Sequence, residues 1–333
     1  MPIDVIVSVK TTGGDYTSLT AAEAGEQRDL VALDQQSVIE LYPMIDTSNN
    51  ITFSGWVTDD THWVIVRTPA SNSHAGIWNE GVWYQKSPFD MMILVVRNIK
   101  IIGLQFMFQG IYTGLKKILV TYGSISGTKH YILKCIFRGV SMTSNETYVV
   151  IDNQPDTGGI LLYVNNCLFY DFNSGATQCL RTNSSYSVVY ANNNTIENGM
   201  WGFYRRYGSL VVKNNLTFNM FYGGYVGGMS AGSVNNAYSE GTDPGTNGLD
   251  ISGYAGINIF EDYVNDNFHL KAGSPCKDMG VDLTNDSSMV LKDDIDGASR
   301  TGIWDIGMDE ITALQVSRLK KPQDRLLRVM VMR

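Results

Sequence analysis

A short phrase recurs five times between Asn98 and Met220, and no other feature of the chain constrains its fold as strongly. Each copy consists of an alternating apolar strand, a polar or small corner and a second short apolar pair. The copies close at Phe106, Phe137, Phe169, Ile196 and Phe218, at steps of 31, 32, 27 and 22 residues. A period of this length, built from strands without an intervening helix pattern, predicts an all-β solenoid.

The composition also favours strands and tight turns over helices. Only 17% of the 333 residues are charged, 33 are glycine, and aromatic and β-branched residues are common. One elongated repeat domain routinely reaches this length. No run of about eighteen apolar residues is present, so we expect no membrane span. The first residues lack the basic and apolar regions of a secretory signal.

The charge is distributed unevenly along the chain. The net charge is −8, but residues 311–333 carry +5, so the remainder carries −13. A mostly acidic body argues against nucleic acid as the main ligand. In residues 311–333, which follow the predicted end of the fold, basic residues alternate with apolar ones. We expect this tail to dock on another subunit. Its docking residues are predicted to be Arg318, Lys320, Lys321, Arg325 and Arg328.

Three parts are expected in the chain. Residues 1–48 form an N-terminal cap and the first strands, with a short helix over 15–25 and strands at 29–33 and 37–42. Such a helix would cover the apolar end of the first coil, because terminal repeats of a solenoid are atypical. Residues 49–310 form the solenoid, and 311–333 form a basic C-terminal arm. Glycine-rich segments between 223 and 256 predict irregular final coils.

Asparagines cluster at the predicted corners, for example at Asn165-Asn166, Asn192 to Asn194 and Asn214-Asn215. Asparagine tolerates left-handed backbone, and its amide can stack in hydrogen-bonded ladders. Cys135 and Cys167 occupy equivalent places in successive repeats. We interpret them as small buried hydrophobes in the core, with a disulfide or a metal pair as the alternative.

The C-terminal part contains three motifs in order. They are Asn267-Phe-His-Leu-Lys-Ala-Gly-Ser-Pro-Cys-Lys-Asp-Met-Gly280, then Asp293-Asp-Ile-Asp-Gly297 with Arg300, and finally Asp305-Ile-Gly-Met-Asp-Glu310. This order resembles the closing module, here residues 266–310, of right-handed parallel β-helix proteins of the pectate-lyase-like and tailspike-like kind. The resemblance implies a single-stranded right-handed parallel β-helix of about nine coils, with three short strands in each. It does not specify an activity, because enzymes, viral tailspikes and non-catalytic adhesins share this fold.

The repeats contain few acidic residues that could act in catalysis. Polysaccharide lyases and hydrolases of this fold need clustered carboxylates, and no two carboxylates of the repeats fall within three residues of each other in a strand-like segment. A pair could form between coils, as with Asp171 and Glu197, with Arg205 as a basic partner. The alternative is that both acids are solvated surface residues.

An aromatic and basic cluster follows in the next coils. It comprises Trp201, Tyr204, Arg205, Arg206, Tyr207, Tyr222 and Tyr225. Aromatic and arginine side chains of this kind suit contact with a glycan, and they are equally enriched at protein interfaces. The third alternative is that some of them fill the core.

No metal site or cofactor is expected from the sequence. The four histidines, His62, His74, His130 and His269, have no metal-ligand spacing. Asp294-x-Asp296-Gly297 resembles half of a calcium loop, but the remaining ligand positions are missing.

These features favour a non-catalytic structural or adhesive protein of a virion surface, of the tailspike, fibre or capsid-decoration type. The resemblance to tailspikes implies a homotrimer that contacts other virion proteins through the arm. Polysaccharide is a further candidate partner. Two alternatives remain, a β-helix polysaccharide lyase or glycoside hydrolase, and a secreted bacterial adhesin of the same fold.

Overall fold

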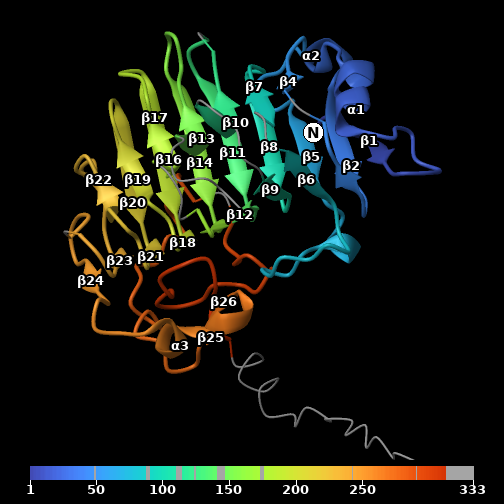
Figure 1. Cartoon of the computed structure of the whole chain (residues 1–333). Helices are drawn as coiled ribbons and strands as arrows, with labels where there is room; N and C mark the ends of the chain where they lie inside the picture. Colours follow the sequence, from blue (N-terminus) through green and yellow to red (C-terminus); the bar gives the residue numbers. More distant parts are fainter. Residues whose placement is uncertain are drawn as a thin grey trace, which may run out of the picture.

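The chain folds into three long parallel β-sheets that run side by side along one axis (Figure 1). The structure is a computed structural model that describes residues 1–48, 50–87, 91–109, 115–123, 125–140, 147–172, 176–241, 243–289 and 291–312. Sheet 1 contains β1 (Ile3–Val9), β2 (Gln35–Leu41), β5 (Val64–Arg67), β8 (Asn98–Ile102), β11 (Thr128–Leu133), β14 (Ile160–Asn165), β17 (Ser187–Asn192) and β20 (Ser209–Lys213).

Sheets 2 and 3 complete each coil. Sheet 2 contains β3 (Ile45–Asp46), β6 (Tyr84–Ser87), β9 (Gln105–Gln109), β12 (Ile136–Val140), β15 (Leu168–Tyr170), β18 (Thr195–Glu197), β21 (Leu216–Phe218), β23 (Ala237–Tyr238) and β24 (Leu249–Asp250). Sheet 3 contains β4 (Ile51–Phe53), β7 (Met92–Leu94), β10 (Lys116–Thr121), β13 (Tyr148–Asn153), β16 (Gln178–Thr182), β19 (Trp201–Arg205) and β22 (Gly223–Val226).

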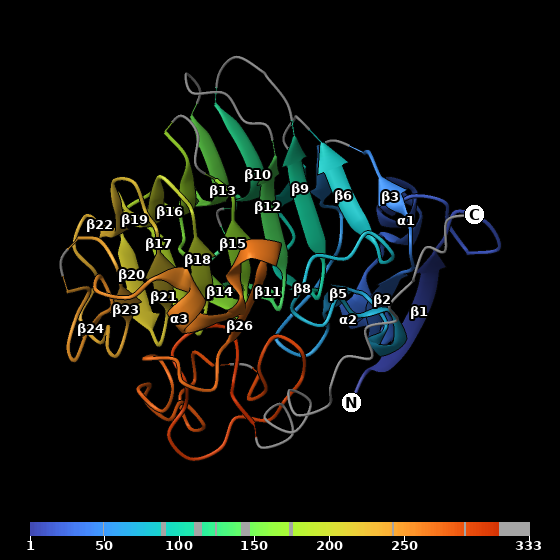
Figure 2. The same cartoon turned by 60° about the horizontal axis from the view of Figure 1, so that its bottom comes forward.

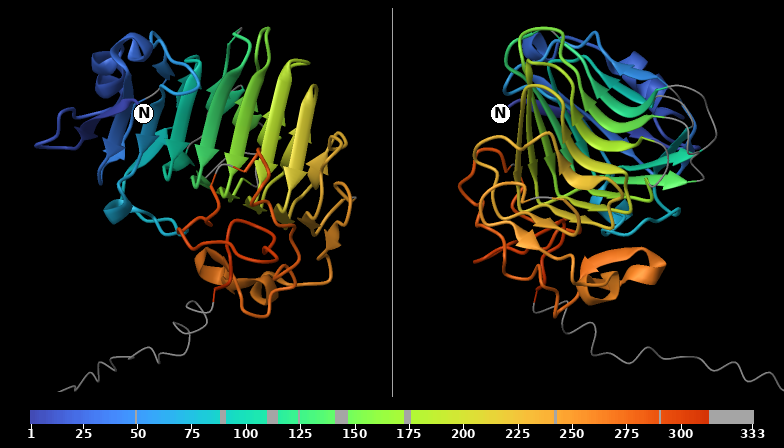
Figure 3. Two further views of the ribbon diagram at one scale, coloured as in Figure 1. Left: turned by 180° about the vertical axis from the view of Figure 1, so that it is seen from behind. Right: turned by 60° about the vertical axis from the view of Figure 1, so that its left-hand side comes forward.

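One strand of each sheet makes up one coil, and every coil pairs in parallel with the next. The view along the axis shows the coils superposed around a common interior (Figure 3). The predicted right-handed parallel β-helix is confirmed. The last coils are short and irregular, since β23 and β24 have two residues each. Within the described residues, no helix has both the length and the apolar character needed to cross a membrane.

The interior is filled by ladders of equivalent residues. Phe106, Phe137 and Phe169 stack with centroids 5.0 and 4.8 Å apart and nearly parallel planes. The register continues to Ile196 and then to Thr217. Phe218 is therefore displaced by one position from the ladder that the repeat predicts. Because a shift of one residue turns a strand side chain to the other face, Phe218 packs against the closing module.

The asparagine corners are confirmed as left-handed positions followed by an amide ladder. Lys134, Asn166, Asn193, Asn214 and Asn235 all have φ between 49° and 55°. The residue after each points inward, and the inward series runs Cys135, Cys167, Asn194, Asn215, Asn236. In that series the Asn215 amide nitrogen donates to Asn236 Oδ1 at 3.0 Å, and Asn215 Oδ1 accepts from Asn194 at 2.9 Å. Cys135 and Cys167 are buried free thiols, so their interpretation as small hydrophobic core residues is confirmed and the alternative of a disulfide is wrong.

A helical cap covers the first coil. Helix α1 (Leu19–Glu26) begins after Ser18, whose side chain accepts a hydrogen bond from the Ala21 N–H. It packs on β1, β2 and β4, and Leu19 and Ala22 are fully buried. The strand predicted at 29–33 is wrong. Residues Leu30–Leu33 form the single-turn helix α2, because the Asp29 carboxylate caps the Ala32 N–H at 2.8 Å.

The closing module folds back along the side of the solenoid (Figure 2). In the structure it begins before the predicted residue 266, with α3 (Gly256–Ile259), β25 (Phe260–Asp262), η2 (Tyr263–Asn265) and β26 (Asn267–Leu270), followed by irregular chain, so the name closing module is used below for residues 256–312. The left-handed corner residues bind it. Asn214 exchanges two hydrogen bonds of 2.8 Å with the Val281 backbone, and Asn166 donates to the Asp293 carbonyl at 2.7 Å. The corners thus both turn the coils and dock the module.

Candidate functional site

An exposed cluster of aromatic rings lies at sheet 3, near the C-terminal end of the solenoid. Trp201 on β19 stacks on Tyr222, one coil further, with centroids 5.0 Å apart and planes at 25°. The Tyr204 ring also stacks with Trp201, with centroids 6.3 Å apart and planes at 24°. Phe221 meets Tyr222 edge to face and is 73% exposed, while Tyr222 is 58% exposed. We call this surface, with Arg205, Arg206 and Tyr207, the aromatic–basic patch.

Tyr225 is not part of the patch. It is only 8% exposed and stacks on Phe203 inside the solenoid, with centroids 5.2 Å apart. Its hydroxyl donates to the carbonyls of Asn215 and Ala237. Burial raises the pKa of this phenol well above its ordinary value. Tyr225 is therefore a core residue, contrary to its prediction as a contact residue. The sequence prediction also missed Phe221.

A polar pocket adjoins the patch where the chain leaves β19. It has a volume of about 460 Å³ and is lined by Gln154, Pro155, Asp156, Asn183, Ser184, Ser185 and Tyr207. Arg206 donates to Asn183 Oδ1 at 3.2 Å, and its guanidinium lies over the Tyr207 ring at 5.3 Å. The pocket therefore combines hydroxyl, amide and carboxylate groups with one aromatic wall.

The coil register brings the predicted acids Asp171 and Glu197 into one cluster on sheet 2. Arg138 joins them, because it pairs in register with Tyr170, which in turn pairs with Glu197. Arg138 lies 3.9 Å from Asp171 and 3.5 Å from Asp266 of the closing module. In this cluster Arg138 pairs with Asp171 and Asp266, and Glu197 lies close enough to both acids to be affected by their charges.

Glu197 is the most perturbed acid of this cluster. It is 4% exposed and accepts a hydrogen bond of 2.7 Å from Tyr263, which lies in the closing module. Burial, assisted by the negative charges of Asp171 and Asp266, raises the pKa of Glu197 to about 7. A carboxyl of this kind is half protonated at neutral pH and can act as a proton donor.

Arg205 does not reach these acids. It lies at the end of β19, where its guanidinium donates to the carbonyls of Gly208 and Gly228 at 2.9 and 3.0 Å. Arg205 therefore belongs to the aromatic–basic patch and stabilises the turn beside it. The predicted basic partner of Asp171 and Glu197 is wrong, and Arg138 occupies that position.

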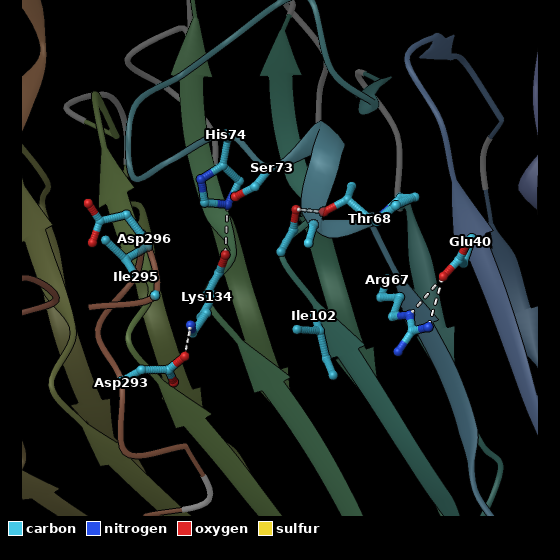
Figure 4. A pocket seen from close by; sticks show the side chains of 14 residues that line it. Glu40, Arg67, Thr68, Ser73, His74, Ile102, Lys134, Asp293, Ile295 and Asp296 are labelled. Atoms are coloured by element: carbon cyan, nitrogen blue, oxygen red, sulfur yellow. Dashed lines mark hydrogen bonds and ion pairs between the residues drawn. The ribbon is translucent and has the colours of Figure 1, made fainter. Parts of the chain in front are cut away.

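A third feature is a groove between the loop after β5 and the closing module (Figure 4). Its volume is about 520 Å³, and it passes from the Glu40–Arg67 ion pair to Asp296. The Lys134 ammonium contacts Asp293 at 2.6 Å across the groove floor. The loop carries η1 (Ala70–Asn72) and His74, whose Nε2 donates to the Lys134 carbonyl at 2.8 Å. Burial lowers the pKa of His74 to about 4, so its ring is neutral.

Beside this groove the closing module assembles a potential metal-ligand set that the sequence analysis missed. One ligand atom each of His269, Asp296 and Asp309 lies within 4.8 Å of the others. The three residues come from β26, a turn and the last described segment, so no sequence spacing could have signalled them. His62 and His130 lie elsewhere, with His62 bonded to Asp59 and His130 buried against the Val96 carbonyl.

The predicted docking residues Arg318, Lys320, Lys321, Arg325 and Arg328 lie outside the described residues. Their role stays a prediction.

Comparisons with known proteins do not assign this chain to a family. No protein-family model matches the chain, and no curated protein matches it.

Proposed function

We propose that this protein is a non-catalytic adhesive β-helix protein that binds carbohydrate through its aromatic–basic patch. The observation that supports this proposal is that the Trp201–Tyr222 ring stack lies at the start of β19 and a polar pocket lies at Tyr207, just beyond the end of the same strand. Trp201 and Tyr207 belong to the same coil, six residues apart, so they are separated by at most about 20 Å. Binding sites for small polar ligands combine aromatic walls with a few oriented polar groups in this way.

A carbohydrate fits this surface better than a flat protein partner does. The pocket offers hydroxyl, amide and carboxylate groups that can exchange hydrogen bonds with sugar hydroxyls. The neighbouring rings offer apolar surface for the C–H faces of the sugar. Arg206 lies beside the pocket, where it contacts Asn183 and Tyr207, and it adds a positive charge, which favours an acidic glycan.

Placement on a virion surface, as a tailspike, fibre or decoration protein, belongs to the same proposal. Its support is the rod-like solenoid and the basic, partly apolar sequence that follows the closed fold. A homotrimer that docks through residues 311–333 is the expected assembly. Light scattering after size exclusion tests it: we expect a trimer for the full chain, and a monomer would contradict this part of the proposal.

A second candidate function is glycoside hydrolysis at the Asp171–Glu197–Asp266 cluster. The raised pKa of Glu197 favours it, since a hydrolase needs a protonated acid beside an ionised carboxylate. However, Glu197 lies beneath Tyr263, so substrate reaches it only if η2 moves away. We therefore rank this function second.

One experiment separates the two functions. The labelled full-length protein is applied to an array of neutral and acidic surface polysaccharides, and every glycan that binds is then incubated with the protein and assayed for new reducing ends and unsaturated products. We expect binding without product release. Product formation that disappears in Glu197→Gln would establish the hydrolase instead, and absence of binding to every glycan would contradict the adhesive proposal.

A further inference from the structure

We propose that His269, Asp296 and Asp309 bind a divalent first-row transition-metal ion, such as Zn²⁺ or Mn²⁺, at the edge of the groove in Figure 4. The three side chains offer one imidazole nitrogen and two carboxylate oxygens. Asp296 lines the groove, which provides the path by which an ion reaches the site. This site is independent of the aromatic–basic patch.

The imidazole of His269 is oriented as a metal ligand. Its Nδ1 lies 2.7 Å from Asn267 Oδ1, which also accepts the backbone N–H of His269. Because that oxygen accepts both hydrogen bonds, Nδ1 carries a proton, and in the neutral ring the lone pair is on Nε2. A hydrogen bond to the distal nitrogen is the usual way in which a protein orients a histidine ligand.

The ligand nitrogen itself has no hydrogen bond. His269 is 9% exposed, and its Nε2 is buried without a hydrogen-bond partner. The nearest Asp296 oxygen, Oδ2, is 3.7 Å away, which is too far for a hydrogen bond. Buried polar atoms in a folded protein almost always have a partner. A cation between the imidazole and the carboxylate supplies one.

The two carboxylates complete the donor set. Asp296 forms a side-chain hydrogen bond with the carboxyl of Asp294, and its Oδ2 faces His269 Nε2. Asp309 is held in place by the Leu270 N–H, which donates to its Oδ2 at 2.7 Å. Donors at about 2.0–2.2 Å from one ion lie at most about 4.4 Å apart. The three ligand atoms lie within 4.8 Å of one another, so they must move together by a few tenths of an ångström or more to hold an ion.

Glycine at position 76 allows the opposite loop to approach this imidazole closely. Gly76 belongs to the loop on the other side of the groove and has φ +72°. A Cβ at this position would lie 2.6 Å from His269 Nε2 and 2.7 Å from Cε1. A side chain there would therefore clash with this edge of the ring and displace the imidazole from its present position.

The donor chemistry selects the class of ion. Imidazole suits Zn²⁺ and its neighbours, whereas Ca²⁺ and Mg²⁺ prefer an all-oxygen shell. Three protein ligands leave at least one position for water. His74 does not contribute, because its Nε2 donates to Lys134 and its Nδ1 accepts from the Gly76 N–H.

The test uses the full-length protein after chelator treatment and dialysis. Mn²⁺ is titrated while the signal of the free ion is followed by electron paramagnetic resonance, and Zn²⁺ is titrated by calorimetry. We expect one ion per chain and a higher melting temperature in its presence, because a ligand that binds only the folded state stabilises it.

Two variants of proposed ligands and one variant of Asn267, which orients His269, are compared with a charge control. His269→Gln and Asp296→Asn should weaken binding at least about 100-fold, and Asn267→Ala should weaken it about 10- to 100-fold. Asp293→Asn removes the same charge from the same groove, but Asp293 is outside the cluster and pairs with Lys134. It should bind the ion with nearly unchanged affinity.

A glycine pair tests the site without altering any ligand. Gly76→Ala places a methyl group at His269 Nε2 and should abolish binding. Gly302→Ala introduces the same backbone strain, since its φ is +73°, but into open space, so it should bind normally. If the wild type binds no Mn²⁺ or Zn²⁺, or if His269→Gln and Gly76→Ala bind as it does, the proposal is wrong.

Discussion

Arg300 of the closing module donates a hydrogen bond of 3.2 Å to the side chain of Asn166, a left-handed corner residue 134 positions earlier in the chain. The same guanidinium forms a 3.1 Å ion pair with Glu310 and donates to the Gly307 carbonyl at 2.9 Å. Its side chain is fully buried. Arg300 therefore connects the module both to itself and to the solenoid.

Replacing Arg300 by lysine should destabilise the protein by about 3–5 kcal/mol. A single ammonium cannot satisfy Asn166, Gly307 and Glu310 together, because it lacks the planar fork of the guanidinium. Urea unfolding measures the loss. Arg28→Lys is the control, since Arg28 forms a partly exposed ion pair with Glu26 and should change stability by less than about 1 kcal/mol. Equal effects of the two substitutions would contradict the connecting role of Arg300.

The amide ladder should be intolerant of change at Asn215. Alanine there removes the hydrogen bonds that the Asn215 side chain forms with Asn194, Asn236 and the Ala191 carbonyl, at a cost of about 2–4 kcal/mol. Asn215→Asp should also destabilise, because a carboxylate cannot donate to the three oxygens that the amide nitrogen now contacts. Thermal unfolding measures both variants. The exposed Asn265→Ala should stay within about 0.5 kcal/mol of the wild type.

Glu197 should make the stability depend on pH. Its pKa is raised to about 7 in the folded state from the ordinary 4.5 of a glutamic acid side chain, so the folded state binds the proton more tightly. Stability is therefore lost as the pH rises from about 4.5 to 7, by up to about 3 kcal/mol for this group. In Glu197→Gln the loss of stability between pH 4.5 and 7 should be smaller by that amount. Burial also raises the pKa of Glu310 to about 7, so part of the loss of stability should remain in this variant.

Denaturation midpoints between pH 4.5 and 8 test this prediction. The exposed Glu80→Gln serves as the control and should follow the wild-type profile. If Glu197→Gln shows the wild-type profile as well, the carboxyl of Glu197 is ionised throughout, and the hydrolase alternative loses its proton donor.

The sequence predicted the fold because each coil repeats the same local chemistry. Left-handed corners, inward amides and the phenylalanine ladder are all encoded at a regular period. The fifth repeat was misaligned, because Phe218 resembles the ladder residues while Thr217 occupies their place. The error at 29–33 has a similar cause, since a short apolar run does not distinguish a strand from a helical turn until the Asp29 cap is considered.

The candidate sites could be predicted only where they follow the coil register. The approach of Asp171 and Glu197 follows from their one-coil separation, and Arg138 could have been found in the same way through its register with Tyr170. Asp266 and Tyr263 could not, because the path of the closing module along the solenoid is not periodic. For the same reason the cluster of His269, Asp296 and Asp309 could not be predicted from the sequence, because only the tertiary fold brings these residues together.

The most direct test of the adhesive proposal is the affinity of Trp201→Ala for the best glycan on the array, measured by calorimetry beside Tyr254→Ala. Tyr254 is an exposed tyrosine outside the patch and should bind as the wild type does. Loss of an aromatic contact residue costs about 2 kcal/mol, so Trp201→Ala should bind roughly 30-fold more weakly while keeping its fold. Wild-type affinity in a folded Trp201→Ala variant would contradict the proposal that the aromatic–basic patch is the binding surface.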